Sequence, residues 1–486
     1  MSQAIALHPW KREQHLYSTE NELVIDAVNA CELVEKYGSP LYVYSEKKLR
    51  QNASDILSNF RRVHRNTRVC FASKACANIA VLQALRDAGL SVEINSGGEF
   101  FKATVAGYQP EEMVFNGVAK LRSELEEVIR AGIKAINVDS LMELKRILEV
   151  ARSVNKQAGI ALRIIPEIKG GASAGWETGT SESKFGMTRD EQRQAIGLIK
   201  NHPDHLRMKG IHAHIGTQIT DENAFRAEAL FLTEYAQEVS AQLPYPLEHI
   251  NLGGGYPKSY TSSDANMMAV PDHYRDNYCT RIDFGTLSEI LIKPVTDALG
   301  QEVEIIVEPG RSMVSDTAIL LTRIESEKQR NGAPVYYLDA GYSVLFDTYM
   351  GWYFHMVNAT RADDTETKLC RMVGPLCDSS DTYYDIEGEG RVKSLLNSDP
   401  ALAQHRETLD KVLVLQPNMR ELPANTRVGD VIALLDTGAY VLEMMNEYCG
   451  RQQAAAVMVD VNSNSRLIRR RSNNEDLLKY DVYESA

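Results

Sequence analysis

The stretch RVCFASKACANIAVLQALRDAG (residues 68–89) joins two different hydrophobic patterns through a single lysine. Residues 69–72 form a short apolar run, which indicates a buried strand. After it, Ile79, Leu82 and Leu85 recur at the spacing of an amphipathic helix. Lys74 stands between the two patterns. The stretch therefore predicts a strand and then a helix, with an amine at the carboxyl end of the strand.

The same alternation of strand and helix continues from this stretch to about residue 308. Segments such as LRSELEEVIRAG, at residues 121–132, carry apolar residues at three- and four-residue steps. Strands are predicted at 69–72, 91–95, 112–115, 135–138, 160–164, 210–214, 249–252 and 303–307. Strands that alternate with helices in this way predict an α/β fold, here a closed parallel (β/α)8 barrel.

The pattern changes after residue 311, where short apolar runs are bounded by Gly, Pro and Asp. Such runs are typical of a β domain. The strand-like PLYVYSE, at 40–46, is expected to join that domain. The predicted organisation is an N-terminal segment over 1–45, a barrel over 46–310 and a β domain over 311–486. A partly helical insertion is expected near 386–425.

Composition excludes several classes of protein. The 486 residues are 44% hydrophobic, enough for a large core, and the formal net charge is −13. That charge argues against nucleic acid, because phosphate binding needs a concentrated positive surface. No signal pattern opens the chain and no apolar run approaches a membrane span. The seven cysteines contain no CxxC pair, so we expect neither a disulfide framework nor a metal site, and a cytoplasmic location.

Polar or glycine residues stand at the carboxyl end of nearly every predicted strand. In parallel barrels the chemistry takes place at this end, where the βα loops begin. Any one of these residues could be structural, but their number at one rim predicts an active site. The residues are Lys74, Glu93, Asn95, Asn116, Asp139, Arg163, His214, Gly253, Gly254, Gly255 and Glu308.

Several of these residues suit parts of one ligand. Lys74, expected beside apolar walls that disfavour its charged form, could form a Schiff base with an aldehyde. The glycines of LGGGYP (252–257) let backbone N–H groups approach a phosphate, for which Thr217 is a further candidate. Glu308 could hold a pyridinium nitrogen protonated, and His214 could stack on an aromatic ring. Pyridoxal phosphate carries all of these groups.

A possible proton donor lies in the predicted β domain. The segment GPLCDSSD, at 374–381, places Cys377 in a Gly-Pro turn beside Asp378. A lone cysteine is usually inert, but a thiol in such a turn beside an acid is a candidate for proton transfer.

Six motifs together resemble a known family. FASK, HIGTQ, NLGGGYP, EPGR, GPLCDSSD and DTGAY occur in the order found in barrel-type, pyridoxal-phosphate-dependent basic amino acid decarboxylases, which include diaminopimelate and ornithine decarboxylases. The resemblance covers about residues 35–470. It implies a barrel with an alanine racemase-like β domain, and a head-to-tail homodimer in which each subunit completes the other's active site.

The resemblance also implies roles for individual residues. Lys74 would carry the cofactor covalently, Glu308 would pair with its ring nitrogen, and His214 would stack on the ring. Glu93 would support the cofactor from the second strand. The phosphate would be surrounded by Thr217, Gly253, Gly254, Gly255, Arg311 and Tyr440. Cys377, from the other subunit, would protonate the reacting carbon, and Asp378 would bind a distal cation on the substrate.

Departures from the family pattern bear on the substrate. Diaminopimelate decarboxylases usually have Glu after the reactive Cys and an arginine in the loop corresponding to 338–355, which binds the distal carboxylate. Here Asp378 follows Cys377 and the loop has no arginine. The segments DAGYSVL and GPLCD and the C-terminal pattern RLIRR...ED..KYD.Y, at 466–483, resemble the bacterial D-ornithine/D-lysine branch. That branch is our first expectation, giving putrescine or cadaverine.

Other readings stay open. Two further substrates are a conjugated amino acid of siderophore or antibiotic synthesis, and meso-diaminopimelate giving L-lysine. Tyr342, Phe354 and Arg311 are additional candidates for substrate contact. A racemase on the same barrel would not need the Cys377–Asp378 motif. A non-catalytic regulator would commonly lack Lys74 or Cys377, and both are present.

Overall fold

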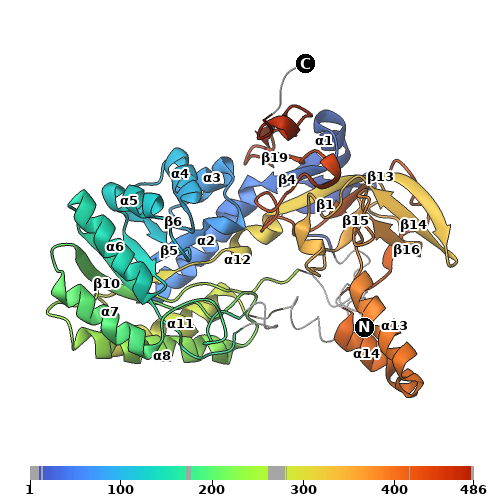
Figure 1. Cartoon of the computed structure of the whole chain (residues 1–486). Helices are drawn as coiled ribbons and strands as arrows, with labels where there is room; N and C mark the ends of the chain where they lie inside the picture. The colour runs from blue at the N-terminus through green and yellow to red at the C-terminus, as the bar shows by residue number, and fades with distance from the viewer. Residues whose placement is uncertain are drawn as a thin grey trace, which may run out of the picture. The chain divides into compact units, whose positions relative to one another are not determined.

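The computed structural model describes residues 10–12, 15–170, 177–260, 280, 282–414 and 416–482 (Figure 1). The chain divides into two compact units. The barrel unit comprises Leu49–Lys258 and Thr280–Val314. The β unit comprises Met1–Lys48, Ser259–Cys279 and Ser315–Ala486. Within the described residues, no helix combines the length and apolar character needed to cross a membrane.

The barrel unit is built on eight parallel strands that close into a ring in chain order, which confirms the predicted barrel. The first four strands begin with the one just before Lys74 and end with the one that finishes at Val138. The strands are β5 (Thr67–Ala72), β6 (Ser91–Ile94), β7 (Met113–Phe115), β8 (Ala135–Val138), β9 (Ala158–Arg163), β10 (Leu206–His212), β11 (His249–Asn251) and β12 (Glu304–Val307). β12 pairs with β5 and so closes the barrel.

Helices surround the strands, most of them amphipathic, whereas the four residues of α12 are all buried (Figure 1). In α6, for example, Leu144, Ile147 and Ala151 are buried, and the side chain of Ser140 caps the first turn. The helices are α2 (Glu46–Val63), α3 (Ile79–Asp87), α4 (Gly97–Ala106), α5 (Arg122–Ala131), α6 (Leu141–Val154), α7 (Arg189–Asn201), α8 (Glu222–Ser240), α11 (Phe284–Leu299) and α12 (Arg311–Val314). A short 3-10 turn, η1 (Ser73–Ala75), carries Lys74 between β5 and α3.

The β unit is organised around one large mixed sheet. Its main path runs β17-β16-β14-β13-β4-β19-β20, and β18 joins β13 to β15. The strands are β4 (Leu41–Ser45), β13 (Ala318–Arg330), β14 (Ala333–Leu338), β15 (Met356–Asn358), β16 (Thr367–Val373), β17 (Arg420–Pro423), β18 (Val431–Leu434), β19 (Ala455–Val459) and β20 (Ser465–Arg469). β4 pairs with both β13 and β19, so the N-terminal strand joins this sheet as expected.

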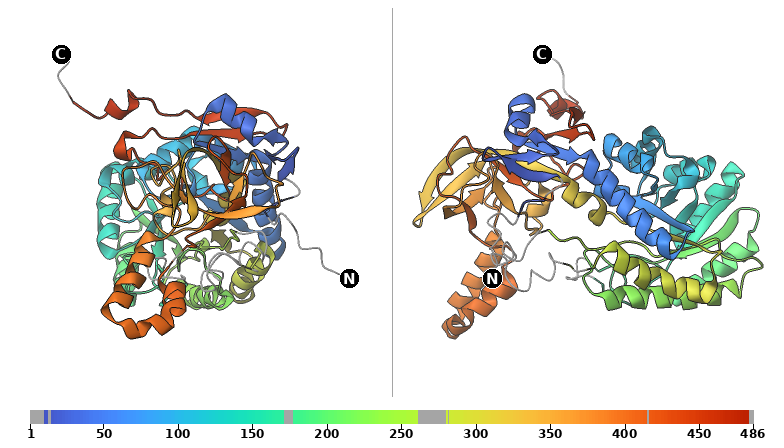
Figure 2. Two further views of the ribbon diagram at one scale, coloured as in Figure 1. Left: turned by 90° about the vertical axis from the view of Figure 1, so that its right-hand side faces the viewer. Right: turned by 180° about the vertical axis from the view of Figure 1, so that it is seen from behind.

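Smaller elements complete the β unit. A three-stranded antiparallel sheet contains β1 (Leu16–Thr19), β2 (Glu22–Ile25) and β3 (Val28–Asn29), followed by α1 (Ala30–Tyr37). The insertion expected near 386–425 contains α13 (Ile386–Ser398), η6 (Pro400–His405) and α14 (Arg406–Leu413). Figure 2 shows α13 and α14 side by side as a hairpin. The end of the expected insertion differs, because Arg420–Pro423 forms β17 and pairs with β16 in the sheet.

Candidate active site

Glu308 follows β12 and is the centre of a buried hydrogen-bond network at the carboxyl end of the barrel. Its Oε2 accepts hydrogen bonds from Asn116 Nδ2 at 2.7 Å and from His212 Nε2 at 3.2 Å. Its Oε1 accepts from Asn251 Nδ2 at 2.6 Å and from Asn137 Nδ2 at 3.4 Å. Four neighbouring strands or strand ends therefore supply the donors to one carboxylate.

The network keeps Glu308 ionised. Burial alone would raise the pKa of Glu308, but His212 and the amide donors outweigh burial and hold the pKa below its usual range. Burial also lowers the pKa of His212, so this imidazole is neutral near pH 7 and donates through its Nε2–H. Because its four hydrogen-bond donors are neutral, the carboxylate keeps its negative charge available for a cationic partner.

Lys74 and Glu93 lie on the same rim. Lys74 is exposed, so the structure does not enclose its amine in apolar walls as the sequence led us to expect. Glu93 is fully buried, and no side chain or backbone group of the described residues is within hydrogen-bond distance and geometry of its Oε1. Burial raises the pKa of Glu93, and the nearby charge of Lys74 partly opposes the rise. The rim thus presents a reachable amine close to a carboxyl group that can donate or accept a hydrogen bond.

His214 lies two residues beyond the end of β10. Its Nδ1 accepts a hydrogen bond from the backbone N–H of Gly254 at 3.2 Å, which leaves the proton of a neutral ring on Nε2. Burial, together with the charges of Lys74 and Arg163, lowers the pKa of His214 well below its usual value. The ring is therefore neutral and fixed in one tautomer, which suits a stacking role better than proton transfer.

The three glycines after β11 allow backbones to pack closely at the rim. Gly253 and Gly255 have φ angles of +56° and +86°, which favour glycine. At Gly254, a Cβ atom would collide with the carbonyl oxygen of Glu308. The loop needs glycine for its conformation and for its approach to Glu308.

Gly254→Ala is expected to lower the thermal stability of the protein and to weaken cofactor binding at least about tenfold, because the new Cβ displaces the backbone of Glu308. Thermal unfolding and cofactor titration measure the two effects. Gly197→Ala in α7 is the matched control, since a Cβ there meets no atom within 4 Å and alanine favours a helix. If the two variants had the same thermal stability and the same affinity for the cofactor, the need for glycine at position 254 would be contradicted.

Two other predicted residues of the barrel unit, Arg311 and Thr217, belong to segments that follow barrel strands in the chain. Arg311 begins α12 and is buried, and Thr217 is half-buried in the segment after β10. These two residues come from the loops that follow β12 and β10, where βα loops of a barrel carry ligand contacts.

The remaining predicted residues belong to the β unit. Cys377 is exposed, and Asp378 beside it accepts a hydrogen bond from the hydroxyl of Tyr342 at 2.8 Å. Tyr440 is half-buried with a φ angle of +58°. Phe354 is buried and its ring packs edge-on against Tyr260. The structure thus joins Asp378 to Tyr342, whereas Phe354 is a packing residue of this unit.

Sequence reasoning missed three members of the Glu308 network: Asn137, His212 and Asn251. Each stands inside an apolar strand, where a single polar residue is commonly a packed one. The signal that could have found them is positional, because Asn251 and His212 are the last residues of their strands and Asn137 is the next to last.

Comparison with protein families places this rim in context. Residues 47–315 match the model described as "Pyridoxal-dependent decarboxylase, pyridoxal binding domain". The chain belongs to the pyridoxal-dependent decarboxylase family. It is therefore an amino acid decarboxylase that uses pyridoxal phosphate, which confirms the reaction class and the cofactor expected from the sequence.

Relatives of this decarboxylase match over nearly the whole chain. A diaminopimelate decarboxylase of Methanocaldococcus jannaschii is 30% identical over 474 residues, which cover 95% of each protein. A solved diaminopimelate decarboxylase from the same organism, in complex with L-lysine, has a TM-score of 0.80 and 28% identity, covering 97% of this chain and 98% of that chain. The Vibrio vulnificus lysine/ornithine decarboxylase complexed with putrescine shares the fold, with a TM-score of 0.66, 18% identity and coverage of 89% and 97%.

The rim has the donor set that pyridoxal phosphate requires. When bound, this cofactor accepts the electron pair left behind as CO2 departs. Lys74 supplies the amine that would hold it covalently, and the ionised Glu308 would keep a proton on its ring nitrogen. The buried Oε1 of Glu93, which accepts no hydrogen bond from the described residues, and the close-packed glycine loop fit a polar ligand at the same place.

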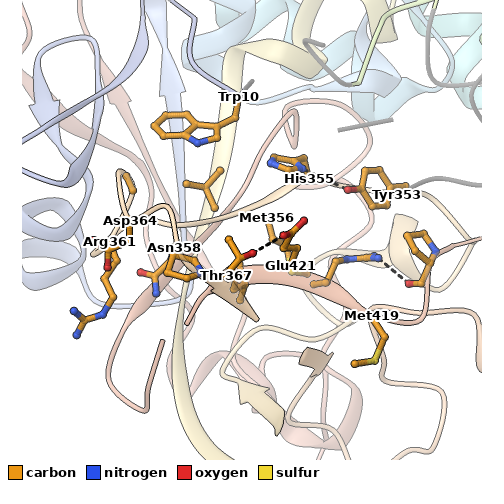
Figure 3. Close-up of a pocket in the computed structure, with 16 residues that line it drawn as sticks. Trp10, Tyr353, His355, Met356, Asn358, Arg361, Asp364, Thr367, Met419 and Glu421 are labelled. Carbon is orange, nitrogen blue, oxygen red and sulfur yellow. Dashed lines mark hydrogen bonds between the residues drawn. The ribbon is translucent and has the colours of Figure 1, made fainter. Parts of the chain in front are cut away.

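A separate cavity of about 170 Å³ lies within the β unit and is shown in Figure 3. Trp10, Thr367 and Glu421 are among the residues that line this cavity. The hydroxyl of Thr367 donates a hydrogen bond to the carboxylate of Glu421. None of the residues predicted from the sequence lines this cavity.

Proposed function

We propose that this decarboxylase removes the α-carboxylate of a basic amino acid whose distal end carries an ammonium group. The ionised Glu308 within its ring of neutral donors carries the proposal, because it supports the electron sink that α-decarboxylation needs. Asp378 supplies the anion for the distal ammonium group.

Meso-diaminopimelate is the first candidate substrate, with L-lysine as its product. It is supported by curated relatives named diaminopimelate decarboxylases, which align with this chain over almost all of their length. These comparisons favour it over our first expectation from the sequence, the D-ornithine/D-lysine branch. The solved lysine/ornithine decarboxylase of Vibrio vulnificus, at 18% identity, shares the fold alone.

D-Ornithine and D-lysine remain the second candidate, because two features of this chain favour a substrate without a distal carboxylate. The loop 338–355 contains no arginine, and its acidic residues are Asp339 and Asp347. Asp378 is an anion beside the predicted reactive thiol. A distal carboxylate would find no arginine in this loop and would be repelled by Asp378.

The chain's own residues suggest a division of work across a homodimer. In the barrel unit, Glu308 holds a proton at the ring nitrogen, and the neutral His214 supports the ring face. We propose that Cys377 and Asp378 of one protomer serve the barrel of the other. There, the thiol of Cys377 would deliver a proton to the α-carbon after CO2 leaves.

The substrate proposal is tested with five amino acids given separately to the cofactor-loaded protein: meso-diaminopimelate, D-lysine, D-ornithine, L-lysine and L-ornithine. Released CO2 and amine are measured by mass spectrometry. L-Lysine formed from diaminopimelate supports the first candidate. Cadaverine or putrescine from the D-forms alone supports the second. No product from any of the five, with the cofactor still bound to Lys74, would overturn both candidates and favour a larger conjugated amino acid.

Cys377→Ala is expected to slow turnover about 10²- to 10⁴-fold, because the variant lacks the proton donor to the α-carbon. The cofactor absorbance should be unchanged, since the thiol does not hold the cofactor. When the reaction is run in D2O, the configuration of the deuterated α-carbon of the product shows whether it was protonated on the wrong face. Cys31→Ala in α1 is the control for loss of a thiol. Normal turnover by Cys377→Ala would remove the thiol from the mechanism.

A further inference from the structure

A fully buried ion pair lies in the barrel unit next to the Glu308 network. Lys120 belongs to the segment between β7 and α5 and is 1% exposed, and Glu143, in the first turn of α6, is 4% exposed. The Nζ atom of Lys120 is 2.7 Å from Oε1 of Glu143. Taking two charges out of water is costly unless further hydrogen bonds stabilise them, so the other partners of this pair matter.

The ammonium group of Lys120 has an acceptor for each of its donors. Besides Glu143, it donates to the backbone carbonyl of Gly117 at 2.6 Å and to that of Asn137 at 2.9 Å. Three acceptors match the three N–H groups of a protonated lysine, whereas a neutral amine has only two. Burial lowers the pKa of Lys120, and the charge of Glu143 opposes this effect. The contacts therefore indicate a charged lysine that is held in one position.

The two carbonyl groups belong to the backbone that carries two of the donors to Glu308. Gly117 follows Asn116, whose Nδ2 donates to Oε2 of Glu308 at 2.7 Å. Asn137 donates from its own Nδ2 to Oε1 of Glu308 at 3.4 Å and also to Oδ1 of Asn116. Lys120 thus ties the carboxyl ends of β7 and β8 together at the residues that present these two amide side chains.

The backbone around Lys120 is fixed from two further sides. The Oε1 atom of Glu143 also accepts a hydrogen bond from the backbone N–H of Asp139 at 3.2 Å, which connects the end of β8 to α6. At Gly117, a Cβ atom would collide with the carbonyl oxygen of Asn95, which follows β6. The ends of three neighbouring strands are therefore packed together where the ammonium group lies.

We infer that Lys120 is a positioning residue for Glu308. It acts through Asn116 and Asn137, whose backbone segments its ammonium group joins, while Glu143 fixes the ammonium group. The hydrogen bond of Asn137 is near the limit of hydrogen-bond length, so a small shift at the end of β8 would break it. A carboxylate that loses amide donors holds a proton more strongly. Glu308 would then compete with the ring nitrogen of the cofactor for the proton, so the inference rests on the role that the proposed function gives to Glu308.

The test removes both charges at once, in the double variant Lys120→Met/Glu143→Gln. Loss of Lys120 alone would leave an unpaired charge in the interior and endanger the fold. In the double variant the glutamine can still accept from the backbone N–H of Asp139, but the ammonium group that joined Gly117 to Asn137 is gone. Thermal unfolding checks that the double variant keeps a cooperative transition.

Lys134→Met is the matched control, just before the opposite end of β8. Lys134 forms an ion pair with Glu304, and the two side chains are 15% and 14% exposed. Glu304 keeps its ion pair with Arg68 in this variant. The control therefore removes another largely buried lysine of the barrel, and none of the hydrogen bonds to Glu308 involves it.

Two properties of the cofactor-loaded full chain are measured. Solid-state NMR with pyridoxal phosphate labelled with ¹⁵N in the ring shows from the chemical shift whether the ring nitrogen is protonated. CO2 release gives turnover and the KM. In the double variant the ring nitrogen should lose its proton in part, and turnover should fall about 10- to 100-fold with little change in the KM, as expected for a displacement of about 1 Å. Lys134→Met should match the wild type in both properties.

The outcomes separate this inference from the proposed function. A ring nitrogen that stays fully protonated in the double variant overturns the inference, whatever the turnover. An equal loss of the ring proton in Lys134→Met also overturns it, because general loosening of the barrel would then explain both results. Glu308→Gln is the reference: if it removes the ring proton and the double variant does not, only the role of Lys120 fails. If Glu308→Gln leaves the ring nitrogen protonated, the role of Glu308 in the proposed function fails, and this inference fails with it.

Discussion

Lys74→Ala should abolish decarboxylation, with a loss of about 10⁴-fold or more, because the rim then has no amine to carry the cofactor. The visible absorbance of the lysine-bound cofactor should disappear in the same variant. Both are measured on purified protein after incubation with excess pyridoxal phosphate. Lys102→Ala, which removes an exposed lysine from α4, is the matched control and should retain both signals.

The same variant also tests which lysine matters. Residual covalent attachment of cofactor to Lys74→Ala, found by peptide mapping after borohydride reduction, would mean that another amine carries it. Such a result would contradict the assignment of Lys74 directly, whatever happened to activity.

Glu308→Gln is expected to lower turnover about 10²- to 10⁴-fold while leaving the cofactor attached to Lys74. The substitution removes the negative charge. It also turns an NH2 group toward side chains, such as Asn116 and Asn251, that donate their own NH2 groups to Glu308. The cofactor spectrum and single-turnover decarboxylation separate attachment from chemistry.

Glu228→Gln in α8 provides a matched control for this change. Glu228 is also fully buried, but burial and the nearby Glu308 raise its pKa well above the usual value, so it is already uncharged. Its replacement by glutamine is therefore nearly isosteric and preserves the charge. A similar loss of turnover in the two variants would show that packing, and not the charge of Glu308, explains the effect.

Much of the barrel could be predicted from the sequence because its strands are buried on both faces. Parallel strands of this kind appear as short apolar runs, and their ends are visible where a polar or glycine residue interrupts the run. Lys74 and Glu308 were found in this way, each just beyond an apolar strand. The helices between them were visible from their three- and four-residue periodicity.

The partners of Glu308 could not be predicted because they depend on strand register. Asn137 and Asn251 come from strands that are far apart in sequence, and a shift of one residue would turn either side chain away from Glu308. The same limit applies to the β unit. Nothing in the sequence near Tyr342 indicates that its hydroxyl contacts Asp378, or that Tyr448 stacks on its ring.

The position of β4 has a consequence for how the chain is made. Leu41, near the start of the chain, pairs with Leu321 on one side and with Ala455 on the other. During synthesis the barrel unit can form once about two thirds of the chain has left the ribosome, whereas β4 must wait for β19. Until then the edge of β4 that pairs with β19 lacks its partner, and unpaired strand edges promote aggregation. Premature termination before β19 would therefore leave a folded barrel attached to an incomplete sheet, a natural substrate for chaperones or proteases.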